Sequence, residues 1–184
     1  MKPSIWRKPR TLCTRTPRVS ALHAALSATL FAFPMLFAAA PAGAVQFSVT
    51  NLGTLGGTYS GAQGINAAGQ VVGYAGTSGD AAIHAFLWQS GSMQDLGTLG
   101  GTDSSATGIN AAGQVVGYAY TTSAAKHAFL WQSGSMQDLG TFGGTYSSAS
   151  GINAAGQVVG TSTTSGNAPR AFLWQSGTMM PPAP

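Results

Sequence analysis

The chain has 184 residues, of which 26 are glycine and 7% are charged, and its formal net charge is +4. Six of its eight basic residues lie before residue 19, and its one cysteine is Cys13. After this leader the chain has two basic residues, Lys126 and Arg170, and four aspartates, so its net charge there is −2. Disulfides are therefore excluded there, and the basic surface that nucleic-acid binding requires is missing.

The first 44 residues have the pattern of a secretory signal peptide. A basic leader precedes an apolar run over residues 21–40, and Ala42-Gly43-Ala44 supplies a small-residue cleavage site. This order predicts cleavage before Val45, a secreted, cell-surface or periplasmic location, and no membrane contact after cleavage. A retained membrane anchor is the alternative, because the run is long enough to span a bilayer, although Pro34 and polar residues interrupt it.

Residues 45–184 are predicted to form one domain with repeats at about 51–94, 95–137 and 138–180. Two landmark segments recur at intervals of 43 or 44 residues: GINAAGQVVG, with Ile65, Ile109 and Ile152, and AFLWQSG, with Phe86, Phe129 and Phe172. A nearly constant period of this length predicts stacked or radially arranged units, because each unit is too small to bury its own apolar face.

In chain order, the middle repeat predicts short strands at 106–110, 114–119, 127–132 and 136–141, joined as an antiparallel meander. Asn110 and Gly113 bound a segment that suits a type I turn followed by a left-handed glycine, and Ser133-Gly134 suits a two-residue hairpin. The same turn residues recur in all three copies.

These strands are apolar on both faces, since Phe86 and Leu87, like Val71 and Val72, point in opposite directions. They therefore need a neighbour on each side, which favours an all-β fold of tandem four-stranded units resembling β-propeller blades. Three units are fewer than the roughly four to eight blades of a propeller. A homo-oligomer completing a larger ring, a closed threefold trefoil-like or prism-like domain, and part of a longer array all remain open.

The two ends of the repeat region differ in phase. Residues 48–54 align with 92–98, which form the fourth strand of a repeat, whereas the last copy continues into Pro181-Pro182 in place of Asp-Leu. We therefore expect the amino-terminal strand to complete the carboxy-terminal unit and so to cover both sheet edges.

The HAFLW stretches at 84–88 and 127–131, together with LGTLGG and GINAAGQVVG, resemble the HAF family of extracellular repeats. The match covers about 51–177, and Arg170 replaces the histidine in the third copy. The resemblance implies an exported, propeller-like repeat protein, and it brings no established activity, substrate or catalytic residue.

Two histidines occupy equivalent places in the repeats. A two-residue turn at Ser90-Gly91 would put His84 diagonal to Asp95, and the same geometry would put His127 near Asp138. We interpret these as structural pairs, because zinc sites need more ligands than two. No metal and no other cofactor are predicted.

Aromatic residues offer two kinds of site. Trp88 and Trp131 lie opposite Met93 and Met136 in the predicted hairpins, which favours core packing over sugar stacking. Three residues at equivalent positions of the predicted Gly-Gly-Thr loops are the candidate ligand contacts, because loops often carry function: Tyr59, Asp103 and Tyr146.

The chain has no glutamate, and after the leader it has no cysteine, no Gly-x-Ser-x-Gly elbow and no His-Glu-x-x-His stretch, so no enzyme is predicted. The expected function is an exported extracellular or cell-surface module with a structural or interaction role and a glycan or extracellular protein as partner. A lectin-like module is the alternative, and an exported hydrolase is the third candidate.

Overall fold

The computed structural model describes residues 47–180, so the predicted signal peptide lies outside the described part. The first unit contains β1 (Gly56–Ile65), β2 (Val71–Thr77), the short 3-10 turn η1 (Ser78–Asp80), β3 (Ile83–Gln89) and β4 (Ser92–Asp95). The second contains β5 (Gly100–Ile109), β6 (Val115–Thr121), β7 (Lys126–Gln132) and β8 (Ser135–Asp138). The third contains β9 (Gly143–Ile152), β10 (Val158–Thr164), β11 (Pro169–Gln175) and β12 (Thr178–Met180). Within residues 47–180 no helix has the length and hydropathy needed to cross a bilayer.

Each unit is a four-stranded antiparallel meander, as predicted. The first turn closes through the Asn110 N–H donating to Gln114 O and the Gly113 N–H donating to Asn110 O, both at 3.1 Å, with Gly113 at φ +78°. At the second turn Ser133 and Gly134 both have positive φ, 52° and 82°. Two positive φ values match a type I′ hairpin, which fits the twist of antiparallel strands.

The first strand of each repeat is longer than predicted, since β5 begins at Gly100. Its pairing with β6 shifts register between Gly100 and Ser104 and again between Ala106 and Gly108. Such bulges break the apolar alternation that identifies a strand in a sequence. The Gly-Gly-Thr segments therefore belong to β1, β5 and β9 and are not loops.

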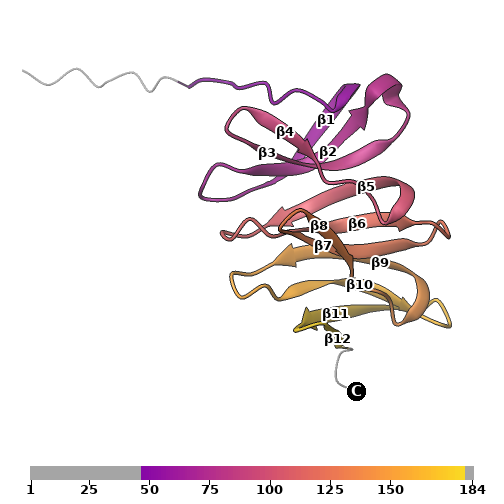
Figure 1. The fold of residues 1–184 in the computed structure, drawn as a ribbon. Coiled ribbons are helices and arrows are strands. Elements are labelled where there is room, and N and C mark those ends of the chain that lie inside the picture. The colour runs from indigo at the N-terminus through magenta and orange to yellow at the C-terminus, as the bar shows by residue number, and fades with distance from the viewer. Residues whose placement is uncertain (1–46, 181–184) are drawn as a thin grey trace, which may run out of the picture. The chain divides into compact units, whose positions relative to one another are not determined.

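The three meanders follow one another in chain order, with their faces in contact (Figure 1). The core lies between them in two layers. The first joins Val72 and Leu87 of one unit to Phe129 and Trp131 of the next, and the second repeats this at the following junction. The expected burial of both strand faces is therefore confirmed at the junctions. Residues 47–180 form no closed barrel or ring.

The predicted exchange of the amino-terminal strand is wrong. Residues 47–54 form no strand, and Phe47 and Val49 are 90% and 98% exposed. The third unit obtains its fourth strand locally, because β12 pairs with β11 and sets Met179 opposite Trp174. A hairpin closed by the two-residue Ser176-Gly177 turn needs far less chain ordering than a strand brought from the other end of the domain.

Candidate functional site

The two histidines each lie beside an aspartate of the neighbouring strand. Phe86 is opposite Asp95, and the His84 Nδ1 to Asp95 Oδ2 distance is 2.7 Å. The corresponding His127 to Asp138 distance is 2.8 Å. The other oxygen of Asp95 accepts the Gly97 N–H at 2.8 Å, so this carboxylate fixes the chain where it leaves β4.

The remaining two carboxylates also accept backbone hydrogen bonds. Asp80 accepts from the Thr58 N–H and the Thr58 hydroxyl, both at 2.8 Å, and the backbone bond is the main reason that the pKa of Asp80 is lowered. Asp103 Oδ1 accepts from the Ile83 N–H at 2.8 Å and so links the second unit to the first. Both aspartates therefore bind parts of the chain that are distant in sequence.

The three predicted ligand contacts lie in strands and not in loops. Tyr59 lies in β1, Asp103 in β5 and Tyr146 in β9, one in each unit. The two tyrosines are 39% and 37% exposed, whereas Asp103 is committed to the junction with β3. The three positions therefore differ in how much of each side chain is available to a ligand.

An aromatic cluster around the single lysine that follows the leader was not anticipated. Lys126 Nζ lies 3.4 Å from the ring centroid of Tyr118 and 5.3 Å from that of Tyr146, and Tyr118 meets Tyr120 edge to face at 6.5 Å. Burial lowers the pKa of Lys126 and is the main cause of the raised pKa of Tyr118. We call these four residues the Lys126 cluster.

The sequence did hold a signal for this cluster. In the β6–β7 hairpin Tyr120 is opposite Lys126 and Tyr118 is opposite Ala128, so Tyr118 and Lys126 are diagonal neighbours on one face. The register argument that placed His84 near Asp95 in the β3–β4 hairpin therefore applies equally to the β6–β7 hairpin. A hollow of about 310 Å³ opens beside Tyr120 and the Gly100–Gly101 backbone.

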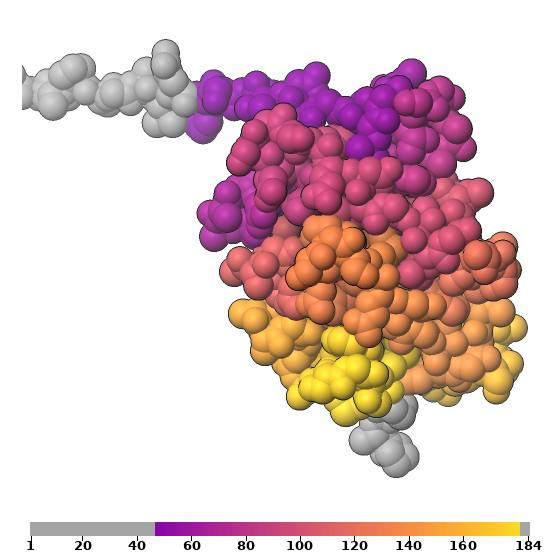
Figure 2. Space-filling model, in the orientation of Figure 1, coloured from indigo at the N-terminus to yellow at the C-terminus, as the bar shows by residue number. Residues whose placement is uncertain are grey.

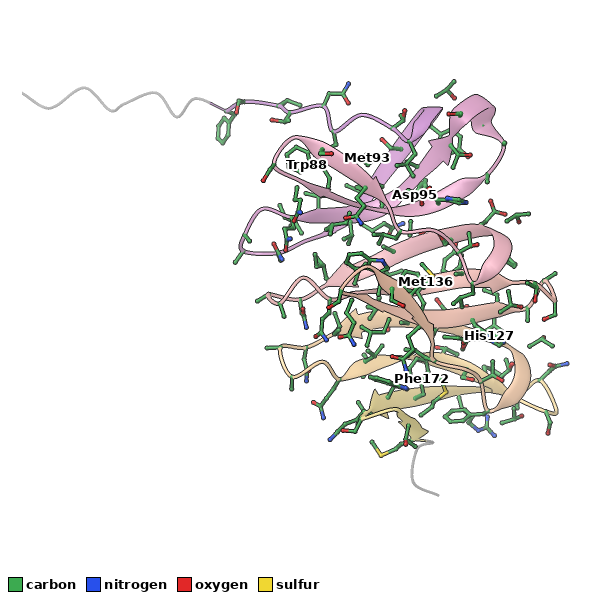
Figure 3. All side chains as sticks on the ribbon, viewed as in Figure 1. Trp88, Met93, Asp95, His127, Met136 and Phe172 are labelled. Atoms are coloured by element: carbon green, nitrogen blue, oxygen red, sulfur yellow. The ribbon has the colours of Figure 1, made fainter. Side chains whose placement is uncertain are left out.

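The tryptophans serve the core at the internal junctions. Trp131 and Trp174 are each 8% exposed and lie opposite Met136 and Met179. Trp88 lies opposite Met93 on the outer side of the first unit, where it is only partly buried (Figure 3). Among residues 47–180 no group of three or more metal-binding side chains is found.

Comparison of the chain with protein-family models finds no match, and no curated protein matches its sequence. The resemblance to HAF repeats therefore stays a prediction that rests on the quoted motifs.

Proposed function

We propose that the protein is an exported extracellular or cell-surface repeat module with a binding or structural role and no catalysis, whose units correspond to propeller-like blades. One observation carries this proposal: all four carboxylates hold strands, turns or imidazoles in place. Glycoside hydrolysis, the third candidate above, normally requires two carboxylates directed at one substrate. Here each carboxylate is hydrogen-bonded to the protein's own backbone or to a histidine side chain.

Cell fractionation after expression of the full-length chain tests the location. We expect a product that starts at Val45, recovered outside the inner membrane and identified by its amino-terminal sequence. A full-length chain retained in the inner membrane would support the anchor instead. For the hydrolase, hydrolytic activity that disappears in the Asp95→Asn, Asp138→Asn double variant would contradict the proposal.

The Lys126 cluster favours glycan binding as the second candidate function. Tyrosine rings offer flat faces to the apolar side of a sugar, and an ammonium group donates hydrogen bonds to hydroxyls. Tyr146 is exposed beside Lys126, and a hollow adjoins Tyr120. These features place aromatic and polar groups on one side of the β6–β7 hairpin.

The glycan hypothesis is tested by thermal unfolding against a panel of polysaccharides, with and without calcium. A glycan that binds the native state raises the unfolding midpoint in a dose-dependent way. Tyr146→Ala should abolish that rise, whereas Tyr59→Ala should preserve it, because Tyr59 occupies the equivalent strand position without a neighbouring lysine. Equal losses in both variants would exclude the Lys126 cluster as the binding site.

A further inference from the structure

The first and third units each leave one apolar face uncovered by residues 47–180. The head face is the outer side of the first unit, where Ile65 is 69% exposed beside Val71. The tail face is the outer side of the third unit, where Val159 is 47% exposed beside Ala171 and Leu173. The two units lie at opposite ends of the space-filling view, indigo and yellow (Figure 2).

Both faces consist of residues that are buried where they recur inside the chain. Val72 and Val116, the equivalents of Val159, are 0% exposed at the two junctions. Ile109 and Ile152, the equivalents of Ile65, pack against the two core layers. Within residues 47–180, two junctions each join an equivalent of the tail face to an equivalent of the head face, and one face of each kind has no partner.

Hydrogen bonds at the junctions show the same pattern, because each is formed between internal units and, in the part of the chain that the structure describes, lacks a partner at the two end faces. Asn66 Nδ2 donates to Asn110 O, and Asn110 Nδ2 donates to Asn153 O, each at 3.0 Å. Asn153 Nδ2 donates to Gln157 at 2.6 Å but, within the described chain, meets no carbonyl of a further unit. The carbonyl of Asn66 is the equivalent acceptor on the head face.

A second hydrogen bond between units is likewise formed at both internal junctions and, among the described residues, lacks a partner at the two end faces. Ala85 N–H donates to the Ser104 hydroxyl, and Ala128 N–H donates to the Ser147 hydroxyl, each at 2.8 Å. Within residues 47–180, the equivalent groups without such a partner are the Ala171 N–H on the tail face and the Ser60 hydroxyl on the head face.

Around Ser60 and Gly53 the head face already has the hydrogen bonds of a closed junction. Ser60 Oγ donates to Gly53 O at 2.7 Å, as Ser147 Oγ donates to Gly140 O at 2.6 Å. Gly53 N–H donates to Asn51 Oδ1 at 3.0 Å, as Gly97 N–H does to Asp95. Because these bonds form before anything docks, this part of the head face needs little further ordering on binding.

Glycines at the junctions allow the backbones of neighbouring units to approach closely. A methyl group built on Gly64 would lie 3.5 Å from Gly108 Cα, and one on Gly108 would lie 3.8 Å from Gly151 Cα. The open faces carry hollows of comparable size, about 420 Å³ at the head and about 390 Å³ at the tail. Gly64 lines the first hollow and Gly151 the second, so the stripe of glycines continues to both ends.

We propose that copies of this chain associate head to tail, with the tail face of one copy bound by the head face of the next. The contact would reproduce the junctions within the chain, with Asn153 donating to the Asn66 carbonyl and Ala171 to the Ser60 hydroxyl of the next copy. Such a heterologous interface produces an open series, or a ring where the rotation closes. The inference goes beyond the proposed binding role and does not depend on it.

Sedimentation velocity over a range of concentrations tests the proposal, with the protein purified as the cell delivers it from the full-length chain. Ile65→Lys disables the head face and Val159→Lys the tail face. A lysine buried at the contact must be desolvated, so each variant alone should associate at least ~10-fold more weakly than the wild type. Mixed together, the two variants should form one-to-one dimers, because one retains a tail face and the other a head face.

Thr122→Lys is the matched control, since it adds the same charge to the exposed loop between β6 and β7 and should assemble like the wild type. Circular dichroism checks that the variants fold, and Ile65→Ser with Val159→Ser replaces any that do not. A wild type that stays monomeric up to millimolar concentration overturns the proposal. So does a mixture that associates no more than its components, which would indicate a symmetric contact or another partner.

Discussion

Asn66 and Asn110 are joined across the junction between the first two units by a 3.0 Å hydrogen bond from the Asn66 side chain to the Asn110 carbonyl. Within its own unit the Asn66 Oδ1 accepts the N–H groups of Ala68 and Gln70, both at 3.1 Å. One side chain therefore closes its own turn with its oxygen and holds the next unit with its nitrogen. Asn110 repeats this arrangement toward Asn153.

Asn110→Asp should separate these two tasks. The carboxylate keeps the turn acceptor but loses the donor to Asn153 O, and it buries a charge at a position that is 5% exposed. We expect a loss of about 1–3 kcal/mol in the free energy of unfolding, measured in urea. Asn153→Asp, measured at a concentration where the protein is monomeric, is the control, because Asn153 is exposed and its nitrogen reaches no further unit of the described chain. Similar losses in both variants would show that the junction bond contributes little.

Gly117→Ala should be strongly destabilising. An added Cβ would overlap the carbonyl oxygen of Ser105 in the neighbouring strand, and backbone cannot move aside as a flexible side chain can. We expect a loss of at least ~2 kcal/mol in the free energy of unfolding. Gly151→Ala should cost less than about 0.5 kcal/mol, because its nearest contact is Val159 Cγ2 at 3.7 Å. Thermal or urea unfolding compares the two, and equal effects would contradict the crowding argument.

The His127–Asp138 pair should contribute little to stability. Its side chains are 19% and 40% exposed, so water screens their interaction. A double-mutant cycle with His127→Gln and Asp138→Asn should give a coupling free energy below about 1 kcal/mol. Asn can still accept the Gly140 N–H through its side-chain oxygen, so the turn after β8 is preserved. A much larger coupling would point to a role beyond pairing the strands.

Asp80 should make stability depend on acid pH. Its pKa in the folded protein lies below the ordinary value of 3.8, chiefly because the Thr58 N–H donates to the charged form. The stabilisation is therefore fully present above pH 3.8 and is lost as the pH falls through the lower folded-state pKa. Asp80→Asn keeps a residue type that tolerates the observed φ of 54° but removes the charge.

The unfolding midpoints of the wild type and Asp80→Asn should thus differ by a constant amount between neutral pH and pH 3.8. The difference should shrink as the pH falls further. Thr58→Val, which keeps the backbone donor, should retain most of the pH dependence. A difference that grows toward acid pH would contradict the assigned direction of the pKa.

Register was predictable wherever a short turn fixed it. The Ser90-Gly91 turn determined that Phe86 is opposite Asp95, and with it the position of His84. The extended first strands were not predictable in this way, because the bulges near Ser104 move residues out of simple alternation. The Gly-Gly-Thr segments therefore look like loops in the sequence. In the Lys126 cluster, Tyr118 and Lys126 follow from the register of one hairpin, whereas the position of Tyr146 depends on the neighbouring unit.

The sequence by itself determined the repeat, its period, the meander and the pairs across each short hairpin, because these depend on local turn geometry and on alternation along a strand. Only the tertiary structure decided which face meets which neighbour, where each carboxylate binds, and that the last unit completes itself with β12. Those outcomes depend on contacts between residues about one repeat apart, such as Asn66 with Asn110. Because the three repeats carry the same residues at equivalent positions, the sequence alone does not show which copy contacts which. Only the arrangement of the units in space decides this.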